Sequence, residues 1–214
     1  RNNFEQKQQV SIYVPYPGSG EIFGLLSAGR CCDVFIPGAE KYTQDALKNG
    51  WIEKESIRKI VRHIPVIATP AENPTNIQSL EDLARPGLRL ALGDIRSCAI
   101  GKLGKKILEK NNLYEQVAKN TKVYGPTVNQ LLIYTATGRV DATIIWEDMV
   151  SWAKGQGKIK VIHIDENKNI VKTIPTAVTT CSKQRDLARA FNMYITSEEG
   201  LRIWEKWGFE ACSE

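Results

Sequence analysis

The chain has 214 residues, of which 42% are hydrophobic and 25% are charged. This composition excludes a disordered chain, a collagen-like repeat and a disulfide-dense miniprotein, because it provides enough apolar material for a substantial core. No apolar run reaches the ~18 residues of a membrane-spanning helix, and residues 1–20 lack the zones of a secretory signal. We therefore expect a globular chain from which any export signal has already been removed.

The charge balance favours anionic partners. There are 29 Lys and Arg residues against 24 Asp and Glu residues, which gives a net charge of +5 at pH 7. The basic residues are spread along amphipathic segments such as Lys102–Lys110 without a dense cluster, and no nucleic-acid-binding motif accompanies them. A small anion is therefore the expected partner, and nucleic acid is not.

The cysteines and histidines do not predict a metal site. There are five cysteines, so they cannot all pair within one chain: Cys31, Cys32, Cys98, Cys181 and Cys212. No CxxC is present, and the two histidines, His63 and His163, lie far apart. We expect no structural metal and no cofactor. A bridge between Cys181 and Cys212 stays open, because spacing alone cannot show that their Cα atoms come within reach.

Strands and helices alternate along the chain. In the first part of the chain the patterns predict strands at 10–14, 33–36 and 63–69, with helices after them through 22–26, at 41–47 and, as a short helix, at 80–84. In the middle they predict strands at 89–92, 123 and 142–146, with helices after them at 98–110, 127–137 and 147–153. Strands at 159–164 and 174–179 follow, and then a helical stretch at 182–207 with a break at 196–197. The alternation predicts an α/β fold built on parallel sheets that helices cover on both faces.

Two strands, near 63–69 and 173–179, each stand between the two halves of this pattern, which suggests that the chain passes there from one lobe to the other. On this interpretation residues 1–65 and 176–214 form lobe 1, residues 70–172 form lobe 2, and the segments near 63–69 and 173–179 are the hinges. A ligand would then bind in a cleft between the lobes. In parallel sheets, ligands bind beyond the carboxyl ends of strands, where helices begin.

Three strand-to-helix turns carry the chemistry. In the first, Ser19 stands between Gly18 and Gly20 and is expected to be the N-cap of a helix. The second runs from Gly93 to Gly101, and the third is residues 125–129. Each helix start exposes unpaired N–H donors and the positive end of a dipole, which together favour an anion. The alternative is that these residues only cap their helices, with no ligand.

The same turns resemble those of a known family. The segments are YPGSGEI at 16–22, CDVFIPGAEKY at 32–42, LRLALGDIRSCAIG at 88–101, TVN at 127–129, 138–146, and 197–209 ending in WGF. Together they resemble the molybdate-binding solute receptors of ABC importers, members of the type II periplasmic binding protein superfamily, almost from end to end. The resemblance implies a two-lobed type II periplasmic-binding-protein-like fold with a ligand cleft between the lobes.

The resemblance also implies ligand-binding residues. In that family two hydroxyls, two backbone amides at helix starts and a tyrosine hydroxyl hold the oxyanion. Ser19 matches one hydroxyl, Ile100 and Val128 match the amides, and Trp146 stands where the tyrosine does. An indole N–H can still donate a hydrogen bond, although it cannot accept one. The further candidate ligand-binding residues are Gly18, Ser97 and Cys98.

The implied function is capture of molybdate or tungstate for import, with molybdenum or tungsten present only as the oxyanion. The resemblance implies a monomeric binding protein without enzymatic activity, located in the periplasm or anchored on the cell surface. Its partners would be a small anion and the membrane subunits of an ABC transporter. A larger organic anion is the alternative ligand.

The sequence departs from the family at several points. Ile95 replaces a proline, Ser97 and Cys98 replace apolar residues, and Trp146 replaces a tyrosine, so a ligand selectivity different from that of the family is an alternative. The family begins with a strand and an alanine-serine turn, whereas residues 2–7 resemble the end of the helix that follows. We therefore expect further residues, including that strand, upstream of the sequence.

Two other classes of function remain open. The effector-binding module of a LysR-type regulator has a related two-lobed domain, and that interpretation predicts a DNA-binding segment before Arg1. A thiol enzyme would use Cys98, because a thiol in the first turn of a helix can have a lowered pKa. Neither His63 nor His163 lies in a turn expected to face the cleft, so a histidine partner for that thiol is not apparent.

Overall fold

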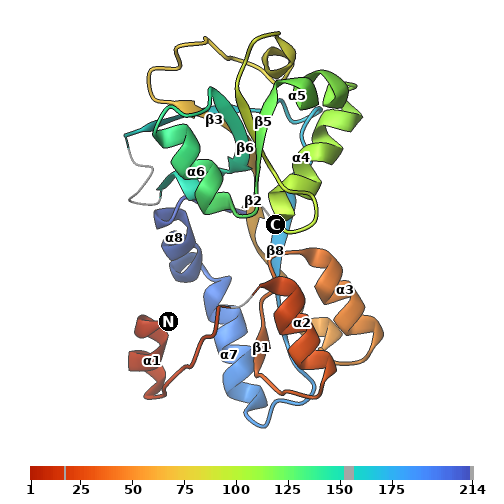
Figure 1. The fold of residues 1–214 in the computed structure, drawn as a ribbon. Helices are drawn as coiled ribbons and strands as arrows, with labels where there is room; N and C mark the ends of the chain where they lie inside the picture. Colours follow the sequence, from red (N-terminus) through yellow and green to blue (C-terminus); the bar gives the residue numbers. More distant parts are fainter. Residues whose placement is uncertain (17, 152–156, 213–214) are drawn as a thin grey trace. The chain divides into compact units, whose positions relative to one another are not determined.

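The computed structural model describes residues 1–16, 18–151 and 157–212, and the chain divides into two compact units. Unit 1 consists of Arg1–Arg62, Lys172–Lys206 and the chain from Glu210 onward, and unit 2 consists of His63–Val171 and Trp207–Phe209. Each unit has its own sheet with helices packed on it (Figure 1). The fold is therefore α/β, as the alternating pattern predicts.

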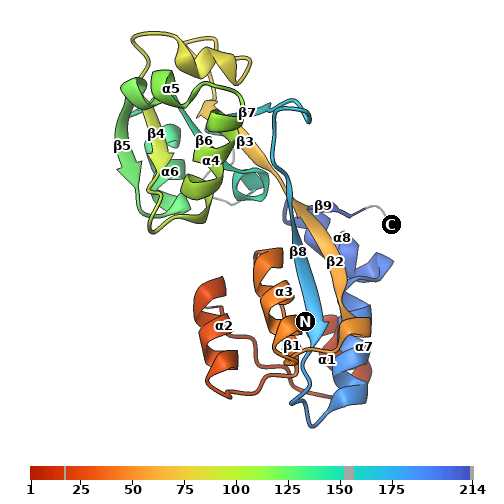
Figure 2. The same cartoon turned by 90° about the vertical axis from the view of Figure 1, so that its right-hand side faces the viewer.

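Unit 1 is built on a four-stranded sheet in the order β1-β8-β2-β9. Its strands are β1 (Val34–Phe35), β2 (Arg58–His63), β8 (Lys172–Val178) and β9 (Glu210–Ala211). Its helices are α1 (Asn2–Gln8), α2 (Ser19–Ser27), α3 (Glu40–Lys48), α7 (Arg185–Ile195) and α8 (Glu198–Lys206), with a 3-10 turn η1 at Lys54–Ser56. In Figure 2, α2 and α3 lie side by side, and β8 runs beside β2.

A buried polar network joins β8, η1 and α7 in unit 1. The Thr176 hydroxyl donates to Asn192 Oδ1 at 2.6 Å, and Asn192 Nδ2 donates to the Ser56 carbonyl at 2.7 Å. The Ser56 hydroxyl in turn accepts from the Val178 N–H at 2.8 Å. Asn192 is only 2% exposed, so these bonds satisfy polar groups that would be costly to bury alone.

Unit 2 is built on a five-stranded sheet in the order β5-β4-β6-β3-β7. Its strands are β3 (Pro65–Pro70), β4 (Leu90–Gly93), β5 (Thr121–Gly125), β6 (Ala142–Trp146) and β7 (Ile159–His163). Its helices are α4 (Ala99–Lys110), α5 (Tyr114–Asn120) and α6 (Val128–Ala136), with 3-10 turns η2 at Glu81–Ala84 and η3 at Glu147–Ser151. The apolar faces of α4 and α6 join the sheet in one core cluster that includes Ile107, Leu131 and Ile144.

The sheets are mixed, so the expectation of purely parallel sheets is wrong. In unit 2, β5, β4 and β6 are parallel, but β3 pairs antiparallel with both β6 and β7. In unit 1, β1 pairs antiparallel with β8, and β2 with β9.

The strand expected at 10–14 is also absent: this segment is irregular. The Ile12 N–H donates to the Glu5 carboxylate at 2.7 Å, so a side chain of α1 takes the place of a strand partner. The helix expected at 147–153 begins as the 3-10 turn η3, and residues 152–153 lie outside the described residues. Helices and strands at most other predicted positions are confirmed, including the break between α7 and α8.

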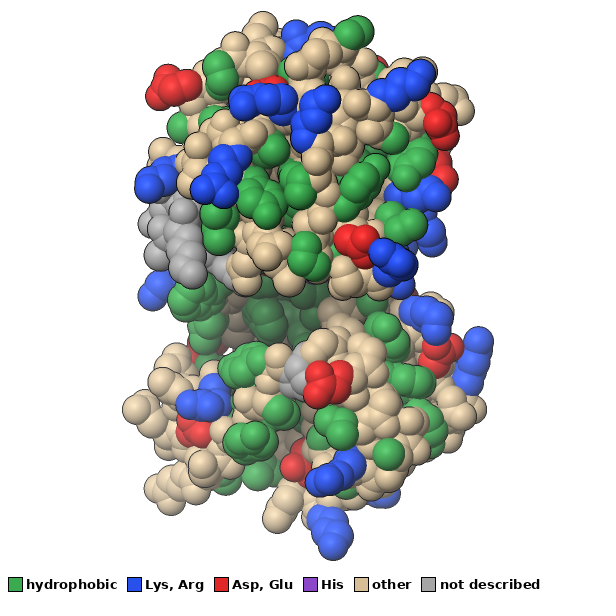
Figure 3. Space-filling view, viewed as in Figure 1, with side chains coloured by type: hydrophobic (Ala, Val, Ile, Leu, Met, Phe, Trp, Pro, Cys, Tyr) green, Lys and Arg blue, Asp and Glu red, His purple; other side chains and the backbone are tan. Residues whose placement is uncertain are grey.

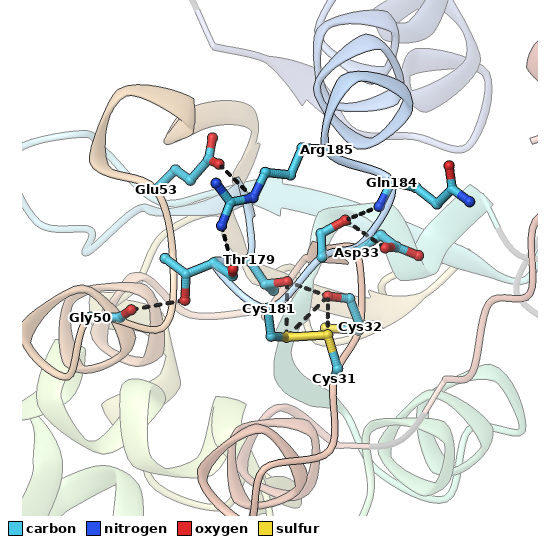
Figure 4. Close-up of a disulfide and its surroundings, with 11 residues drawn as sticks. Cys31, Cys32, Asp33, Gly50, Glu53, Thr179, Cys181, Gln184 and Arg185 are labelled. Carbon is cyan, nitrogen blue, oxygen red and sulfur yellow. Dashed lines mark hydrogen bonds and ion pairs between the residues drawn. A yellow bond between two sulfur atoms is a disulfide. The ribbon is translucent and has the colours of Figure 1, made fainter.

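A disulfide joins Cys31 to Cys181 across 150 positions of sequence, with 5.8 Å between their Cα atoms (Figure 4). The alternative bridge between Cys181 and Cys212 is therefore wrong. Cys212 instead continues the β2–β9 pairing, because its N–H donates to the Ile60 carbonyl at 3.3 Å. Cys32 remains a free cysteine beside the bridge. Partial loss of water around its sulfur, and then the nearby Asp33 carboxylate, raise the pKa of the Cys32 thiol.

The disulfide also lies in a cluster of hydrogen bonds. The Thr179 hydroxyl donates to the Cys32 carbonyl, and the Ser182 hydroxyl donates to the Asp33 carboxylate at 2.6 Å (Figure 4). These bonds connect the segment before β1 with the segment after β8. The two segments of unit 1 that come before and after unit 2 in the sequence are thus joined both by a disulfide and by hydrogen bonds.

No helix in the described part of the chain is long and apolar enough to cross a membrane. On the face shown in Figure 3, the Lys and Arg side chains lie scattered among polar and apolar residues. That face therefore does not carry the dense basic patch that nucleic-acid binding favours.

Candidate functional site

The carboxyl edge of the parallel strands in unit 2 brings together several of the predicted residues. Because β4, β5 and β6 are parallel, their last residues, Gly93, Gly125 and Trp146, lie at the same edge of the sheet. Gly93 is paired with Gly125 in the sheet, and the Asp94 N–H extends that pairing by donating to the Gly125 carbonyl at 2.9 Å. The turns that lead into α4 and α6 therefore begin side by side.

The two helices that follow these turns pack on opposite faces of the sheet. α4 covers one face of the sheet and α6 covers the other, as the two ribbon views show together (Figures 1 and 2). Neighbouring parallel strands whose helices diverge in this way form a topological switch point, where open α/β sheets bind ligands. The geometry thus points to the ends of β4 and β5.

The turn into α4 is held by the side chain of Asp94. Its Oδ1 accepts from the N–H groups of Arg96 at 2.9 Å and Ser97 at 3.0 Å, and from the Ser97 hydroxyl at 3.1 Å. These backbone N–H groups, that of Arg96 first, hold the pKa of the Asp94 carboxyl below its ordinary value. The carboxylate therefore organises the turn, and it uses up the amides of Arg96 and Ser97.

Not every amide at the start of α4 is used in a helical hydrogen bond. The N–H groups of Gly101 and Lys102 donate to the Cys98 carbonyl at 3.1 and 3.3 Å. The N–H of Ile100 comes before these first helical bonds, and no described residue accepts a hydrogen bond from it. The Ile100 side chain is 1% exposed and packs in the core, which fixes the position of its amide.

Two glycines allow the start of α4 to approach the end of β4 closely. A Cβ atom added at Gly101 would lie 2.3 Å from the Gly93 carbonyl oxygen and 2.7 Å from that of Asp94. A Cβ at Gly93 would lie 2.7 Å from the Gly101 backbone. Any larger residue at these positions would push the helix away from the strand.

The start of α6 has the same character. Thr127 is the N-cap, and its hydroxyl oxygen accepts from the Gln130 N–H at 3.3 Å, while its carbonyl accepts from Leu131 at 3.4 Å. The N–H of Val128, the first helical residue, has no acceptor among the described residues. Unpaired N–H groups at a helix start, together with the helix dipole, attract anions.

In unit 1, Ser19 is placed differently from the expectation. The N-cap of α2 is Gly18, whose carbonyl accepts from Glu21 and Ile22, and Ser19 is the first helical residue. The extended backbone of Gly18 provides the cap without a side-chain bond, so the expected N-cap role of Ser19 is wrong. The Ser19 oxygen instead accepts from the Gly38 N–H at 2.9 Å, which leaves its O–H proton available to donate.

Trp146 is buried and lies against a residue that sequence reasoning excluded from the site. Its indole ring stacks on the His63 imidazole, with ring centroids 3.6 Å apart and planes within 17°. His63 is the last residue of β2, two positions before Pro65, the first residue of β3, which pairs with Trp146. His63 therefore lies at the same edge of unit 2 as the ends of β4 and β5. No local pattern could have revealed this, because the stack depends on the pairing of β3 with β6.

The remaining predicted residues differ in their surroundings. Ser97 is exposed in the turn, whereas Cys98 is 4% exposed and belongs to the core of unit 2. Burial in the core removes the solvent-accessible thiol that a Cys98 enzyme would need. Gly18 is exposed, and a Cβ there would meet no atom within 4 Å, so packing does not require a glycine.

Among the described residues, no group of three or more His, Cys, Asp or Glu side chains could hold a metal ion. The backbone amides of Ile100 and Val128, which have no acceptor among the described residues, open the two helices that follow the carboxyl edge of unit 2. Such a donor set suits an anion rather than a cation.

Comparison with known proteins gives similarities over almost the whole chain. A family model described as "Bacterial extracellular solute-binding protein" matches residues 1–210. The "Putative ABC transporter substrate-binding lipoprotein YvgL" of Bacillus subtilis is 30% identical over 212 residues, covering 99% of this chain and 80% of that protein. The "Molybdate-binding protein ModA" of Mycobacterium tuberculosis is 25% identical over 201 residues, covering 94% of this chain and 74% of that protein.

The fold is similar to that of a solved structure from Clostridium difficile, described as the "substrate binding domain of putative molybdenum ABC transporter". The TM-score is 0.86 at 23% identity, and the match covers 99% of this chain and 93% of that one. Helices and strands in both units thus have counterparts in a protein whose sequence has diverged widely.

Proposed function

The chain belongs to the family of bacterial extracellular solute-binding proteins, and on that premise we propose that it captures a small tetrahedral oxyanion, molybdate or tungstate first, for an ABC importer. The Bacillus and Mycobacterium relatives support the importer and the oxyanion by their names. The protein would act in the periplasm or on the cell surface, passing the anion to the membrane subunits of the transporter.

One observation carries the choice of an oxyanion. At the switch point of unit 2, the amides of Ile100 and Val128 open two helices that start from paired strand ends, and both amides come before the first helical hydrogen bonds. Two helix starts at one sheet edge give an anion both donors and favourable dipoles. Trp146 ends the neighbouring parallel strand β6 at the same edge, and its indole N–H is the third donor in this proposal.

Ser19 of unit 1 is a further proposed donor. Because its oxygen already accepts from Gly38, its hydroxyl proton can point toward an anion without a competing role as acceptor. The proposed donors are all uncharged. Neutral dipoles can stabilise an anion when they replace its water shell, and no counter-cation is then needed.

Calorimetric titration with molybdate, tungstate, sulfate, phosphate and a few carboxylates tests the proposal. We expect heat of binding with molybdate and tungstate, and weaker binding or none with the carboxylates. If only an organic anion binds, the solute-binding function stands and the oxyanion proposal is wrong. The contribution of unit 1 is tested separately by Ser19→Ala, which should weaken oxyanion binding by about 1.5–3 kcal/mol, the scale of a hydrogen bond to a charged group.

The matched control for Ser19→Ala is Ser27→Ala. Ser27 ends the same helix, and its exposed hydroxyl donates only to the Gly24 carbonyl at 2.8 Å. Affinity should be unchanged in this variant. Equal affinities for the Ser19 variant and the parent protein would remove Ser19 from the site.

Family membership favours the receptor over the two other functions considered from the sequence. The matched family consists of extracellular solute-binding proteins, which is at odds with the effector module of a transcription factor. The burial of Cys98 in the core of unit 2 argues against a thiol enzyme. A larger organic anion remains the competing ligand, and the carboxylates in the titration address it.

A further inference from the structure

A tyrosine hydroxyl without a hydrogen-bond partner lies beside the start of α2. Tyr42 belongs to α3, which packs against α2 in unit 1 (Figure 2). A Cβ atom added at Gly20 would lie 3.3 Å from Tyr42 Oη and 3.9 Å from Tyr42 Cζ. Since the Cα–Cβ bonds of a helix tilt toward its N-terminus, the hydroxyl lies beside the first turn of α2.

Packing holds the Tyr42 ring in place but leaves its hydroxyl unused. The ring centroid lies 5.5 Å from that of Phe23, which lies 5.6 Å from that of Trp51, and all three rings pack against the core of unit 1. Among the described residues, none makes a hydrogen bond with Tyr42 Oη. A phenol hydroxyl in a fixed position is therefore available to a ligand.

The nearby ammonium group does not take the place of this hydroxyl. Lys41 Nζ lies 5.7 Å from the centroid of the Tyr42 ring, but it is bonded to the Asp45 carboxylate. That hydrogen bond raises the pKa of Lys41 and lowers the pKa of Asp45. The positive charge beside Tyr42 is thus already balanced, and the group that Tyr42 offers is a neutral dipole.

The first turn of α2 carries further free donors. The first helical hydrogen bonds are accepted by the Gly18 carbonyl. The N–H groups of Ser19 and Gly20 come before them and have no acceptor in the described part of the chain. The Ser19 oxygen accepts from the Gly38 N–H at 2.9 Å, which leaves the Ser19 hydroxyl proton available. Two hydroxyls and two amides therefore lie at one turn of unit 1.

We propose that Tyr42 is a further ligand-binding residue, whose hydroxyl donates to an oxygen of the anion that Ser19 binds, and that Gly20 leaves the room which this hydroxyl needs. The inference rests on the proposed function, because it assumes that the oxyanion meets the start of α2. A tyrosine hydroxyl is an uncharged donor, like the other donors of the proposed site. It contributes a hydrogen bond to the anion without adding a positive charge.

Tyr42→Phe tests the contact, because it removes the hydroxyl and keeps the ring that packs on Phe23. Molybdate binding, measured by isothermal titration calorimetry, should weaken about tenfold or more, the loss expected for one hydrogen bond to a charged ligand. The unfolding midpoint without molybdate should change little, since the hydroxyl has no partner in the protein. The control is Tyr13→Phe, which should leave the affinity unchanged because Tyr13 is 88% exposed.

Gly20→Ala tests the geometry. The added Cβ would lie 3.3 Å from Tyr42 Oη, closer than ordinary van der Waals contact, so the hydroxyl must shift and molybdate binding should weaken. In the Tyr42→Phe background that oxygen is absent and the ring carbon lies at an ordinary 3.9 Å, so Gly20→Ala should cause no further loss. The two substitutions should therefore be non-additive in a double-mutant cycle.

The same helix provides the matched control for Gly20→Ala. A Cβ at Gly24 would meet no atom within 4 Å, so Gly24→Ala should leave molybdate binding unchanged in both backgrounds. If Tyr42→Phe binds molybdate as tightly as the unmodified protein, or if the losses in the Gly20 and Tyr42 variants add, the inference is wrong while the proposed function stands. If the unmodified protein binds none of the oxyanions, the proposed function is wrong, and this inference is overturned with it.

Discussion

At the scale of single residues, the proposed site depends on backbone atoms, and Val128 allows one of them to be removed. Val128 is the first residue of α6, a position at which proline fits because its missing N–H makes no helical bond. The preceding Thr127 has φ −136° and ψ 152°, an extended conformation that a following proline also favours. The amide at 128 can therefore be deleted while the helix is kept.

We predict that Val128→Pro weakens molybdate binding by about 1.5–3 kcal/mol, because one hydrogen bond to a charged ligand is lost. The unfolding midpoint should change little. The control is Val128→Ala, which also shortens the side chain but keeps the N–H, and it should bind nearly as well as the unmodified protein. Equal affinities for the two variants, measured by calorimetry, would exclude this amide from the site.

At the scale of elements, the packing of α4 on β4 distinguishes two glycines in the same helix. A Cβ at Gly101 would lie 2.3 Å from the Gly93 carbonyl oxygen, whereas a Cβ at Gly104 would make ordinary contacts of 3.8–3.9 Å with Ile144. Gly101 therefore has a steric role, and Gly104 does not.

We predict opposite effects of alanine at these two positions. Gly101→Ala should lower the free energy of unfolding by about 1–3 kcal/mol, the usual cost of overpacking, and should also weaken anion binding by displacing the amide of Ile100. Gly104→Ala should raise the free energy of unfolding by up to about 1 kcal/mol, since alanine is the better helix former. Urea unfolding of both variants measures this difference, and a stable Gly101→Ala protein would contradict the proposed close approach.

Elements with a regular local pattern could be predicted from sequence. The turn into α4 follows from the apolar run at 89–92, which ends in Gly93, and the turn into α6 follows from Pro126 and Thr127, which open a helical pattern. The helices at both positions are confirmed. β2 was missed because its two fully buried residues, Ile60 and Val61, are adjacent and do not alternate with exposed ones. α5 was missed because it is only seven residues long and buries just Val117 and Asn120.

Contacts between distant segments could not be predicted. The stack of His63 on Trp146 requires the antiparallel register of β3 and β6, which no local pattern specifies. The partner of Cys181 likewise depends on how the two ends of unit 1 meet. The resemblance to a known family identified Trp146 but gave no information about the ring beneath it, because that ring belongs to a different part of the sequence.

At the scale of the whole molecule, the Cys31–Cys181 bridge closes a loop of the chain that contains all of the contiguous part of unit 2. We predict that replacing both cysteines by serine lowers the stability of the folded protein by about 2–5 kcal/mol, as for other native disulfides. Urea unfolding of the double variant, and of the unmodified protein with and without a reducing agent, measures this loss. Cys212→Ser is the control, since Cys212 is a free thiol outside the bridge; a similar loss in that variant would show that the effect comes from the substitution and not from the bridge.

The division of the chain between the units has a further consequence for how the protein is made. Residues 63–171 of unit 2 are contiguous in the sequence and are synthesised one after another. The sheet of unit 1, in contrast, needs β8 and β9, which are synthesised much later than β1 and β2. The five-stranded sheet of unit 2 can thus form while synthesis is still under way, because all of its strands lie within residues 63–171, although Trp207–Phe209 join the unit later. The sheet of unit 1 must instead wait for the carboxyl-terminal residues. Premature truncation should therefore leave the sheet of unit 2 formed but attached to an unpaired, aggregation-prone amino-terminal segment.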